Sequence, residues 1–296
     1  MNLIEKKMVQ LLMELKDKHG VAGVKAEFEA EGTRSEEAMR LKEISLRAGL
    51  EMTIKIGGCE AIKDMFEAGS LGTKHLVAPM VETPYALKKF LAATRLAFEK
   101  DQRDDMEFFI NIETITACRN FDDMLKLLEI DQLDGVVFGR VDLTGSMGLD
   151  RKAVNSREIL DLCLSMAAKA KAKGKKVVVG GAISVHSIPF LRSFPEGHLD
   201  RFETRKVVFG CPKALNNKED AFLKAVEFEI LWLKNKKDYY GAIHREDDAR
   251  LAMMEERYHK SIEAIENAGS GAKAPTEPTL LSPNHSGSTA REFRGR

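Results

Sequence analysis

The stretch FFINIETITACRNFDDMLKLLE, residues 108–129, contains the pattern that decides the fold. Its apolar run is typical of a buried strand, and a helix-like segment follows a short polar tip that holds Asn111 and Glu113. A buried carboxylate is costly unless it is paired. Glu113 is therefore either a helix cap in water or a charge with a partner elsewhere in the fold.

The same strand–helix unit recurs along the chain. Apolar segments with strand character lie at 21–30, 51–57, 74–82, 106–113, 133–140, 175–183 and 201–210, after an amphipathic helix at 3–18. Seven such units with short connections indicate a parallel sheet covered by helices. No GxGxxG follows the first strand, so a (β/α)8 TIM-type barrel is favoured over a dinucleotide-binding sheet. We read only seven strands, and expect the eighth to be a missing or hidden first strand near the N-terminus.

The chain is predicted to have three parts. Residues 1–215 form the barrel with its N-terminal helix, and residues 216–267 form a C-terminal helical extension that is broken near Gly241. The tail 268–296 is rich in Gly, Ser, Pro and Thr and lacks apolar periodicity, so we expect it to be disordered.

Composition narrows the functional classes. Lys plus Arg and Asp plus Glu both number 46, and this zero net charge argues against nucleic-acid binding. Four scattered cysteines without a CxxC pair indicate reduced thiols in a cytoplasmic protein rather than a zinc site or a disulfide framework. The sequence has no signal peptide and no apolar run of membrane length, so no membrane partner is expected.

Two carboxylates are predicted to meet at the mouth of the barrel. Active sites of such barrels lie at the carboxyl ends of the strands, where Glu113 and Asp142 follow neighbouring strands. Converging carboxylates repel unless a cation lies between them, and hard oxygen ligands suit Mg²⁺ or Mn²⁺. The alternative is that both residues are separate helix or loop caps.

Cations are predicted at the same mouth. Lys55 and Arg140 each follow a strand, and Arg140 lies in the Gly-rich segment GRVDLTGSMG, residues 139–148, so we expect an anionic substrate there. Lys55 could instead form an ion pair with Glu27 or Glu29. Arg205 could reach a substrate phosphate, but it lies near the start of its strand, which favours an ion-pair cluster at the opposite end of the barrel.

Three segments resemble the HpcH/HpaI aldolase and citrate lyase β-subunit family. They are KIGGCEAIKDMFEAGSLGTKHLVAPMVET at 55–83, FFINIETITACRN at 108–120 and LDGVVFGRVDLTGSMG at 133–148, and the likeness extends in order and spacing over residues 20–210. The resemblance implies a phosphoenolpyruvate-mutase-like (β/α)8 barrel and a metal-dependent carbon–carbon lyase.

The resemblance also implies roles for individual residues. Glu113 and Asp142 match the two metal-ligand carboxylates, and Asn111 matches a polar position beside the metal. Lys55 matches the cation that holds the 2-oxo acid and its enolate. Acidic residues after an early strand correspond to Glu27 and Glu29, and a water or one of Glu27, Glu29 and Glu31 could relay a proton. The Gly-rich segment, with Gly139, Arg140 and Leu143, corresponds to the cradle for the substrate carboxylate.

The sequence departs from the family pattern at three positions. Lys55 replaces an Arg, Ala30 replaces the catalytic His of the aldolases, and Arg140 replaces a Pro. We therefore expect a lyase or aldolase that acts on a 2-oxo acid or similar small anionic carboxylate, as a homo-oligomer that associates through its C-terminal helices. The alternatives are a CoA-thioester lyase of the citryl-CoA or malyl-CoA type and a non-catalytic barrel.

Overall fold

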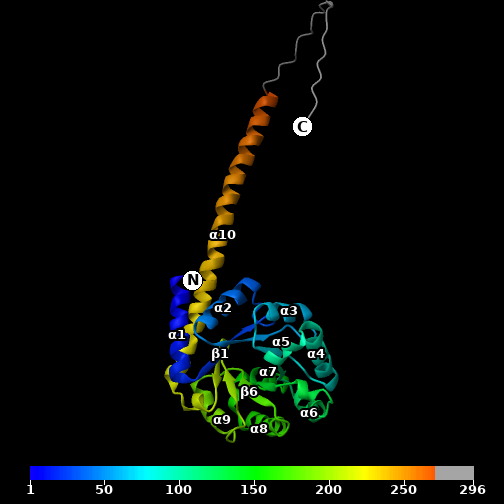
Figure 1. Ribbon diagram of the computed structural model, residues 1–296. Coiled ribbons are helices and arrows are strands. Elements are labelled where there is room, and N and C mark those ends of the chain that lie inside the picture. The colour runs from blue at the N-terminus through cyan, green and yellow to red at the C-terminus, as the bar shows by residue number, and fades with distance from the viewer. Residues whose placement is uncertain (271–296) are drawn as a thin grey trace, which may run out of the picture. The chain divides into compact units, whose positions relative to one another are not determined.

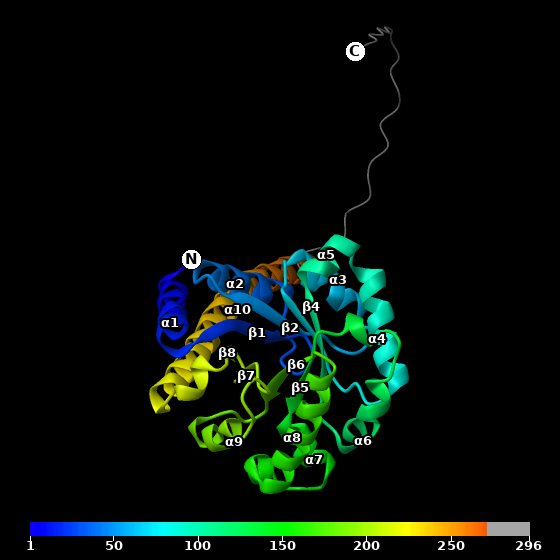
Figure 2. The same cartoon turned by 60° about the horizontal axis from the view of Figure 1, so that its bottom comes forward.

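A computed structural model describes residues 1–270, and the chain divides into two compact units, residues 1–239 and 240–296. The first unit is a closed barrel of eight strands with helices around it (Figures 1 and 2). The strands are β1 Val21–Glu27, β2 Glu51–Lys55, β3 His75–Ala78, β4 Glu107–Ile112, β5 Gly135–Gly139, β6 Lys176–Gly180, β7 Arg201–Glu203 and β8 Val207–Gly210.

Helices connect the strands in the order that the sequence predicts. The α-helices are α1 Leu3–His19, α2 Ser35–Arg47, α3 Ile62–Ser70, α4 Pro84–Ala97, α5 Lys100–Asp105, α6 Ile115–Met124, α7 Arg140–Ser146, α8 Arg157–Ala172, α9 Ile188–Arg192 and α10 Glu219–Ser270. Short 3₁₀ turns lie at η1 Ile130–Gln132, η2 Arg151–Asn155, η3 Val185–Ser187 and η4 Lys213–Asn216. The barrel fold is therefore confirmed.

The eighth strand is not where the sequence analysis expected it. Strands β1 to β7 pair in parallel around the barrel, whereas β8 is antiparallel to both β7 and β1. The predicted strand 201–210 is in fact a hairpin of two short strands joined by a turn at 204–206. No first strand is missing, because α1 leads directly into β1, and the hairpin supplies the strand that closes the barrel.

N-terminal capping residues determine where several of the connecting helices begin. The Thr83 side chain accepts a hydrogen bond from the backbone N–H of Ala86, and Pro84 occupies the first turn of α4. Thr114 caps α6 in the same way. These caps determine where α4 and α6 begin after β3 and β4, and therefore which residues between strand and helix lie at the barrel mouth.

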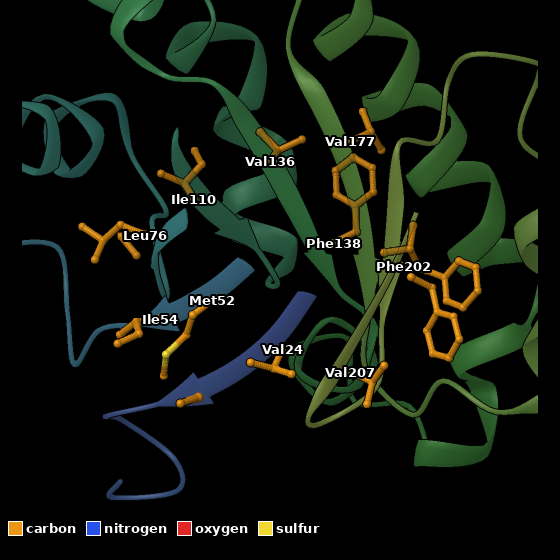
Figure 3. Close-up of a cluster of buried hydrophobic side chains, with 14 of the residues drawn as sticks. Val24, Met52, Ile54, Leu76, Ile110, Val136, Phe138, Val177, Phe202 and Val207 are labelled. Atoms are coloured by element: carbon orange, nitrogen blue, oxygen red, sulfur yellow. The ribbon is translucent and has the colours of Figure 1, made fainter. Parts of the chain in front are cut away.

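The strands divide their side chains between two cores. Outward-facing residues such as Val24, Ile54, Ile110 and Phe138 are fully buried between the strands and the helices (Figure 3). A smaller apolar cluster holds Val77, Phe109, Val137 and Val178, which alternate with the outward-facing set on β3 to β6. On β1 and β7 the corresponding positions carry charges, as described below.

Helix α10 is continuous through Gly241, so the predicted break there is wrong. Within the first unit, one face of α10 is buried through Phe222, Ala225, Phe228 and Trp232. In the second unit, residues 240–270 are helical. The predicted disorder of residues 268–296 falls almost entirely outside the described residues. Among those that are described, no helix is long and apolar enough to cross a membrane.

Candidate active site

A cavity of about 570 Å³ lies at the carboxyl ends of the strands. Its walls come from the ends of β1, β2, β4, β5, β6 and β7, the segments that follow them, and the first turns of α10. The lining residues that carry charge are Lys25, Glu27, Lys55, Glu113, Asp142, Arg151, Glu203, Arg205, Glu219 and Glu229. The fold therefore brings charged residues from distant parts of the chain to one cavity.

Glu113 is held rigidly at the end of β4. Its side chain is 1% exposed, Oε1 accepts a 2.9 Å hydrogen bond from the backbone N–H of Met80, and Oε2 accepts a 2.7 Å bond from Asn111 Nδ2. Met80 has a positive φ of 50°, an uncommon conformation for a non-glycine residue. Burial raises the pKa of Glu113, and the nearby Lys55 ammonium opposes this rise.

Glycine is required where β5 passes Glu113. A Cβ atom on Gly139 would lie 2.6 Å from Glu113 Oε2 and 2.8 Å from Glu113 Cβ. Gly139 thus lines the cavity and lets the buried carboxylate approach the backbone of β5. The absence of a side chain at this position has a packing reason as well as the predicted role in substrate binding.

The second predicted carboxylate lies at the same cavity. Asp142, in the first turn of α7, is exposed and lines the cavity, and its charge contributes to raising the pKa of Glu113. Asn111 Oδ1 is buried without a hydrogen-bond partner in the described structure. These oxygens suit a hard divalent cation such as Mg²⁺, which is commonly held by one or two carboxylates with water and substrate oxygens.

The described residues contain no cluster of three or more His, Cys, Asp and Glu side chains that could hold a metal ion. A cation bound by Glu113 and Asp142 would therefore need further ligands from water, substrate or an amide oxygen such as Asn111 Oδ1. The orphaned amide oxygen and the two carboxylates at one cavity make the site compatible with Mg²⁺ or Mn²⁺.

Lys55 combines the two roles that the sequence analysis weighed. Its Nζ lies 2.8 Å from Glu29 Oε2, and the side chain also lines the cavity. Burial lowers the pKa of Lys55, but the charges of Glu113, Glu29 and Glu27 more than offset this effect, so the pKa is raised. Lys55 therefore stays a cation beside Glu113, while Glu29 serves as its ion-pair partner and does not line the cavity.

A buried lysine that the sequence analysis missed lies deeper in the barrel. Lys25 Nζ is 2.6 Å from Glu203 Oε1 and 3.0 Å from Glu27 Oε1, and all three side chains are buried. Burial disfavours the charged form of each residue, but the cations Lys25 and Lys55 hold the pKa of Glu27 below its usual value. In turn, the carboxylates of Glu203 and Glu27 raise the pKa of Lys25. The period of two along β1 could have revealed Lys25, because it shares a strand face with Glu27.

The hairpin changes the position of two further residues. Because β7 ends at Glu203, both Glu203 and Arg205 line the cavity at the barrel mouth, and the expected cluster at the opposite end is wrong. Arg205 also lies 3.8 Å from Glu229 on α10. The sequence analysis placed Arg205 at the opposite end because the segment 201–210 has the pattern of one continuous strand.

Arg140 does not face the cavity, so its predicted role in substrate binding is wrong. Its side chain is completely buried, and its guanidinium lies 4.6 Å from the centre of the Phe190 ring. The guanidinium donates hydrogen bonds to the backbone oxygens of Gly180, Gly181 and Val154 and to the side chains of Asn155 and Ser187. Burial lowers its pKa to about 10. Arg140 instead fixes the segment after β6.

The predicted Gly-rich cradle is a helix. Residues Arg140–Ser146 form α7, and the Leu143 side chain is buried in the core and does not line the cavity. From this segment the cavity receives Gly139, Val141 and Asp142. After β6 it receives Gly181, which has a positive φ of 81°, and the exposed His186.

Comparison with known proteins gives a family and a fold. Residues 39–184 match the model of HpcH/HpaI aldolase/citrate lyase. The solved HpcH/HpaI aldolase from Desulfitobacterium hafniense DCB-2 is similar, with a TM-score of 0.58 and 14% identity over 80% of this chain and 90% of that one. No curated protein matched the sequence.

Two more solved structures share the fold at low identity. The citrate synthase SbnG has a TM-score of 0.53 and 14% identity over 77% of this chain and 98% of its own. An HpcH/HpaI aldolase/citrate lyase family protein from Burkholderia cenocepacia J2315 has a TM-score of 0.51 and 13% identity over 76% and 99%.

Proposed function

Residues 39–184 belong to the HpcH/HpaI aldolase/citrate lyase family, and we propose that this protein is a divalent-metal-dependent carbon–carbon lyase acting on a 2-oxo acid or similar anionic carboxylate. The observation that carries the proposal is the buried Glu113, with a raised pKa, beside Asp142 and the Lys55 cation in one cavity. Such a charge arrangement is typical of functional sites.

The metal would be Mg²⁺ or Mn²⁺, held by Glu113 and Asp142. When bound, a divalent cation supplies Lewis acidity toward the oxygens of a 2-oxo acid. Met80 and Asn111 keep both Glu113 oxygens in fixed positions through their hydrogen bonds. This rigidity favours a site whose charges are already in place before the substrate arrives.

The residues of the chain would then act on the substrate as follows. In cleavage of a 4-hydroxy-2-oxo acid, a base takes the proton of the C4 hydroxyl, the C3–C4 bond breaks, and its electron pair forms the enolate of C2 and C3. The Lys55 ammonium stabilises the developing negative charge. Protonation at C3 releases the 2-oxo acid, and the C4 fragment leaves as an aldehyde or ketone.

Glu27 is a poor proton acceptor because its pKa is lowered in the ion pair with Lys25. Glu29 is occupied by Lys55 and lies outside the cavity lining. A water molecule is therefore the better proton relay, since a general base can act through one water. Of the relays that the sequence left open, which were water, Glu27, Glu29 and Glu31, water is therefore the one that we propose.

A CoA-thioester lyase is the second candidate, because the cavity is larger than a small 2-oxo acid requires. The volume of about 570 Å³ lies well within the range of sites for drug-sized ligands, and Phe222, Leu223 and Val226 give it an apolar wall. A three-carbon acid alone would leave much of this space to water. Competition by CoA esters in a binding assay separates this candidate from an enzyme of free 2-oxo acids.

The test is a metal-dependent cleavage and condensation screen with 2-oxo acids, combined with calorimetric Mg²⁺ titration. Glu113→Gln is expected to lose metal binding and to reduce turnover by at least about 10³-fold, because it removes a charged ligand from a buried site. Glu158→Gln, an exposed change on α8, serves as the control. Full activity of Glu113→Gln would refute the proposal, and absent metal binding in the unmodified protein would favour a non-catalytic barrel.

A further inference from the structure

The first turns of helix α10 form one wall of the active-site cavity. Four apolar residues of this helix line the cavity, namely Phe222, Leu223, Ala225 and Val226. Phe222 and Ala225 are buried, and the Phe222 ring packs against the Phe202 ring with 6.3 Å between their centres. Leu223 and Val226 are 61% and 52% exposed. The packing of the barrel therefore uses the inner pair, and the outer pair gives the cavity an apolar surface that the fold does not require.

Two carboxylates lie at the ends of this apolar surface. Glu219 precedes Leu223 by four residues and Glu229 follows Val226 by three, and both carboxylates line the cavity. Residues three or four apart lie on the same face of a helix. The α10 wall is defined as Glu219, Leu223, Val226 and Glu229. It is an apolar strip with an acidic residue at each end, and among the described residues of α10 no cationic side chain lines the cavity.

The cations that line the rest of the cavity mostly have carboxylate partners in the protein. Three of the four have a carboxylate oxygen at 3.8 Å or closer, and these are Lys25, Lys55 and Arg205. Arg205 is shared between Glu31 and Glu229, at 3.8 Å from each. The fourth, Arg151, is exposed and has no ion-pair partner within the described chain. An anionic ligand therefore finds one unpaired cation here, and that cation faces solvent.

The charge balance of the cavity limits what a substrate can bring. The described lining contains six carboxyl side chains and four cationic ones, an excess of two acidic groups. A divalent cation at Glu113 and Asp142 would balance this excess, and the carboxylate of a 2-oxo acid would then bring one negative charge. A second anionic group would add another, beside a wall that ends in Glu219 and Glu229. Like charges repel more strongly out of bulk water, so the cavity favours a second substrate without charge.

We propose that the second substrate of this site is an uncharged apolar aldehyde whose carbon chain lies against Leu223 and Val226. Because this rests on the proposed lyase function, the aldehyde is the fragment that C3–C4 cleavage releases. In the reverse direction, C3 of the 2-oxo acid loses a proton to water, the enolate forms a bond to the aldehyde carbon, and the aldehyde oxygen takes a proton from water. The apolar chain would fill the part of the cavity, about 570 Å³ in all, that a small 2-oxo acid leaves to water.

An aldehyde acid is the competing second substrate, because Arg151 offers a cation at the cavity. An ion pair with an exposed side chain contributes little in water. By contrast, each methylene group that an apolar surface removes from water strengthens binding about 4-fold. Several methylene groups against Leu223 and Val226 therefore outweigh one contact with Arg151. At the α10 wall, an aldehyde acid would also place its carboxylate near Glu219 or Glu229.

Deuterium exchange and condensation kinetics on the full-length protein with Mg²⁺ test the two substrates separately. Exchange of the C3 hydrogens of pyruvate and of 2-oxobutanoate, followed by NMR in heavy water, requires enolate formation but no aldehyde. Condensation is then measured with propanal, butanal, pentanal and 5-oxopentanoate. We expect kcat/KM to rise about 15-fold from propanal to pentanal, at about 4-fold for each methylene group. Pentanal should exceed 5-oxopentanoate by at least about 10-fold, because the carboxylate meets the acidic ends of the α10 wall.

Substitutions on α10 test the wall itself. Leu223→Gln removes apolar area, and its kcat/KM is expected to rise less than about 5-fold from propanal to pentanal. Leu233→Gln is the matched control, because Leu233 is an exposed leucine of α10 outside the cavity lining, and its variant should keep the wild-type ratio. Circular dichroism checks that both variants are folded. Absent exchange with both acids would refute the proposed function, and this proposal with it. Normal exchange with 5-oxopentanoate used as well as pentanal, or the same chain-length ratio in both variants, would overturn this proposal alone.

Discussion

Gly139 offers a quantitative test of how the candidate site is built. A methyl group at this position would lie 2.6 Å from Glu113 Oε2, whereas ordinary van der Waals contact begins at 3.4 Å. In Gly139→Ala the carboxylate must therefore move by about 0.8 Å. Rotation of the side chain does not relieve the contact, because Glu113 Cβ would also be only 2.8 Å away. The end of β4 or of β5 must shift.

The expected cost has two parts. Overpacking of this kind reduces the free energy of unfolding by about 1 to 3 kcal/mol. A misplacement approaching 1 Å in a reacting site can reduce turnover by about 10²-fold. Gly139→Ala is therefore expected to lose stability in urea unfolding, to bind Mg²⁺ more weakly in calorimetry, and to lose about 10²-fold in kcat/KM on any substrate that the screen identifies.

Substitutions at two other glycines distinguish the loss of stability from the loss of metal binding and turnover. In Gly135→Ala, at the other end of β5, the added methyl group would lie 2.4 Å from the Phe109 ring and 2.6 Å from the Lys176 backbone oxygen. It should lose similar stability while keeping its Mg²⁺ affinity. Gly145→Ala meets nothing within 4 Å and lies in α7, so it should be neutral or more stable by up to about 1 kcal/mol. If Gly139→Ala and Gly135→Ala bind Mg²⁺ equally well, the reasoning about Glu113 as a metal ligand is refuted.

Two further predictions concern charged residues away from the reacting centre, the buried Arg140 and the partly buried Glu107. Arg140→Met should lower the free energy of unfolding by at least about 3 kcal/mol, because it leaves several buried oxygens without donors; Arg140→Lys should recover less than half of this loss, since lysine lacks the planar fork. Denaturant titrations of both variants measure this, and a wild-type value for Arg140→Met would show that the network contributes nothing. The second prediction concerns Glu107, whose pKa is held at about 2, against an ordinary 4.5, by the neighbouring His75 and Lys176. A depressed pKa stabilises the fold above pH 4.5, and this contribution, at most about 3 kcal/mol, is lost as the pH falls toward 2. The unfolding free energy of Glu107→Gln should therefore fall less steeply than that of the wild type over this range, and parallel curves would contradict the prediction.

The strand–helix alternation of the sequence determined the barrel. Apolar runs such as FFINI, each followed by a helical segment, leave few solutions other than a parallel sheet covered by helices, because every strand must be covered on both faces. Active sites of such barrels lie at the carboxyl ends of the parallel strands, which meet at the same mouth. This predicts that Glu113, Asp142 and Lys55 line one cavity. These inferences need only local periodicity and strand direction.

Strand direction also explains why the prediction for residues 201–210 was wrong. The segment 201–210 reads as one apolar strand with polar residues at its start, and only the closed barrel shows that it turns back at 204–206. That reversal moves Glu203 and Arg205 to the mouth. A hairpin without glycine or proline in its turn leaves no strong local signal for such a change.

Side-chain orientation was likewise decided by packing. Arg140 and Asp142 are two residues apart after the same strand, but the short helix α7 turns Arg140 into the core and leaves Asp142 at the cavity. The sequence determined that Glu113, Asp142 and Lys55 lie at one end of the barrel, because strand order and direction follow from the repeating pattern. Only the tertiary structure added Lys25, Glu203 and Arg205 to that end. Only the tertiary structure decided which of those charges have protein partners and which face the cavity, because that depends on contacts between segments far apart in the chain.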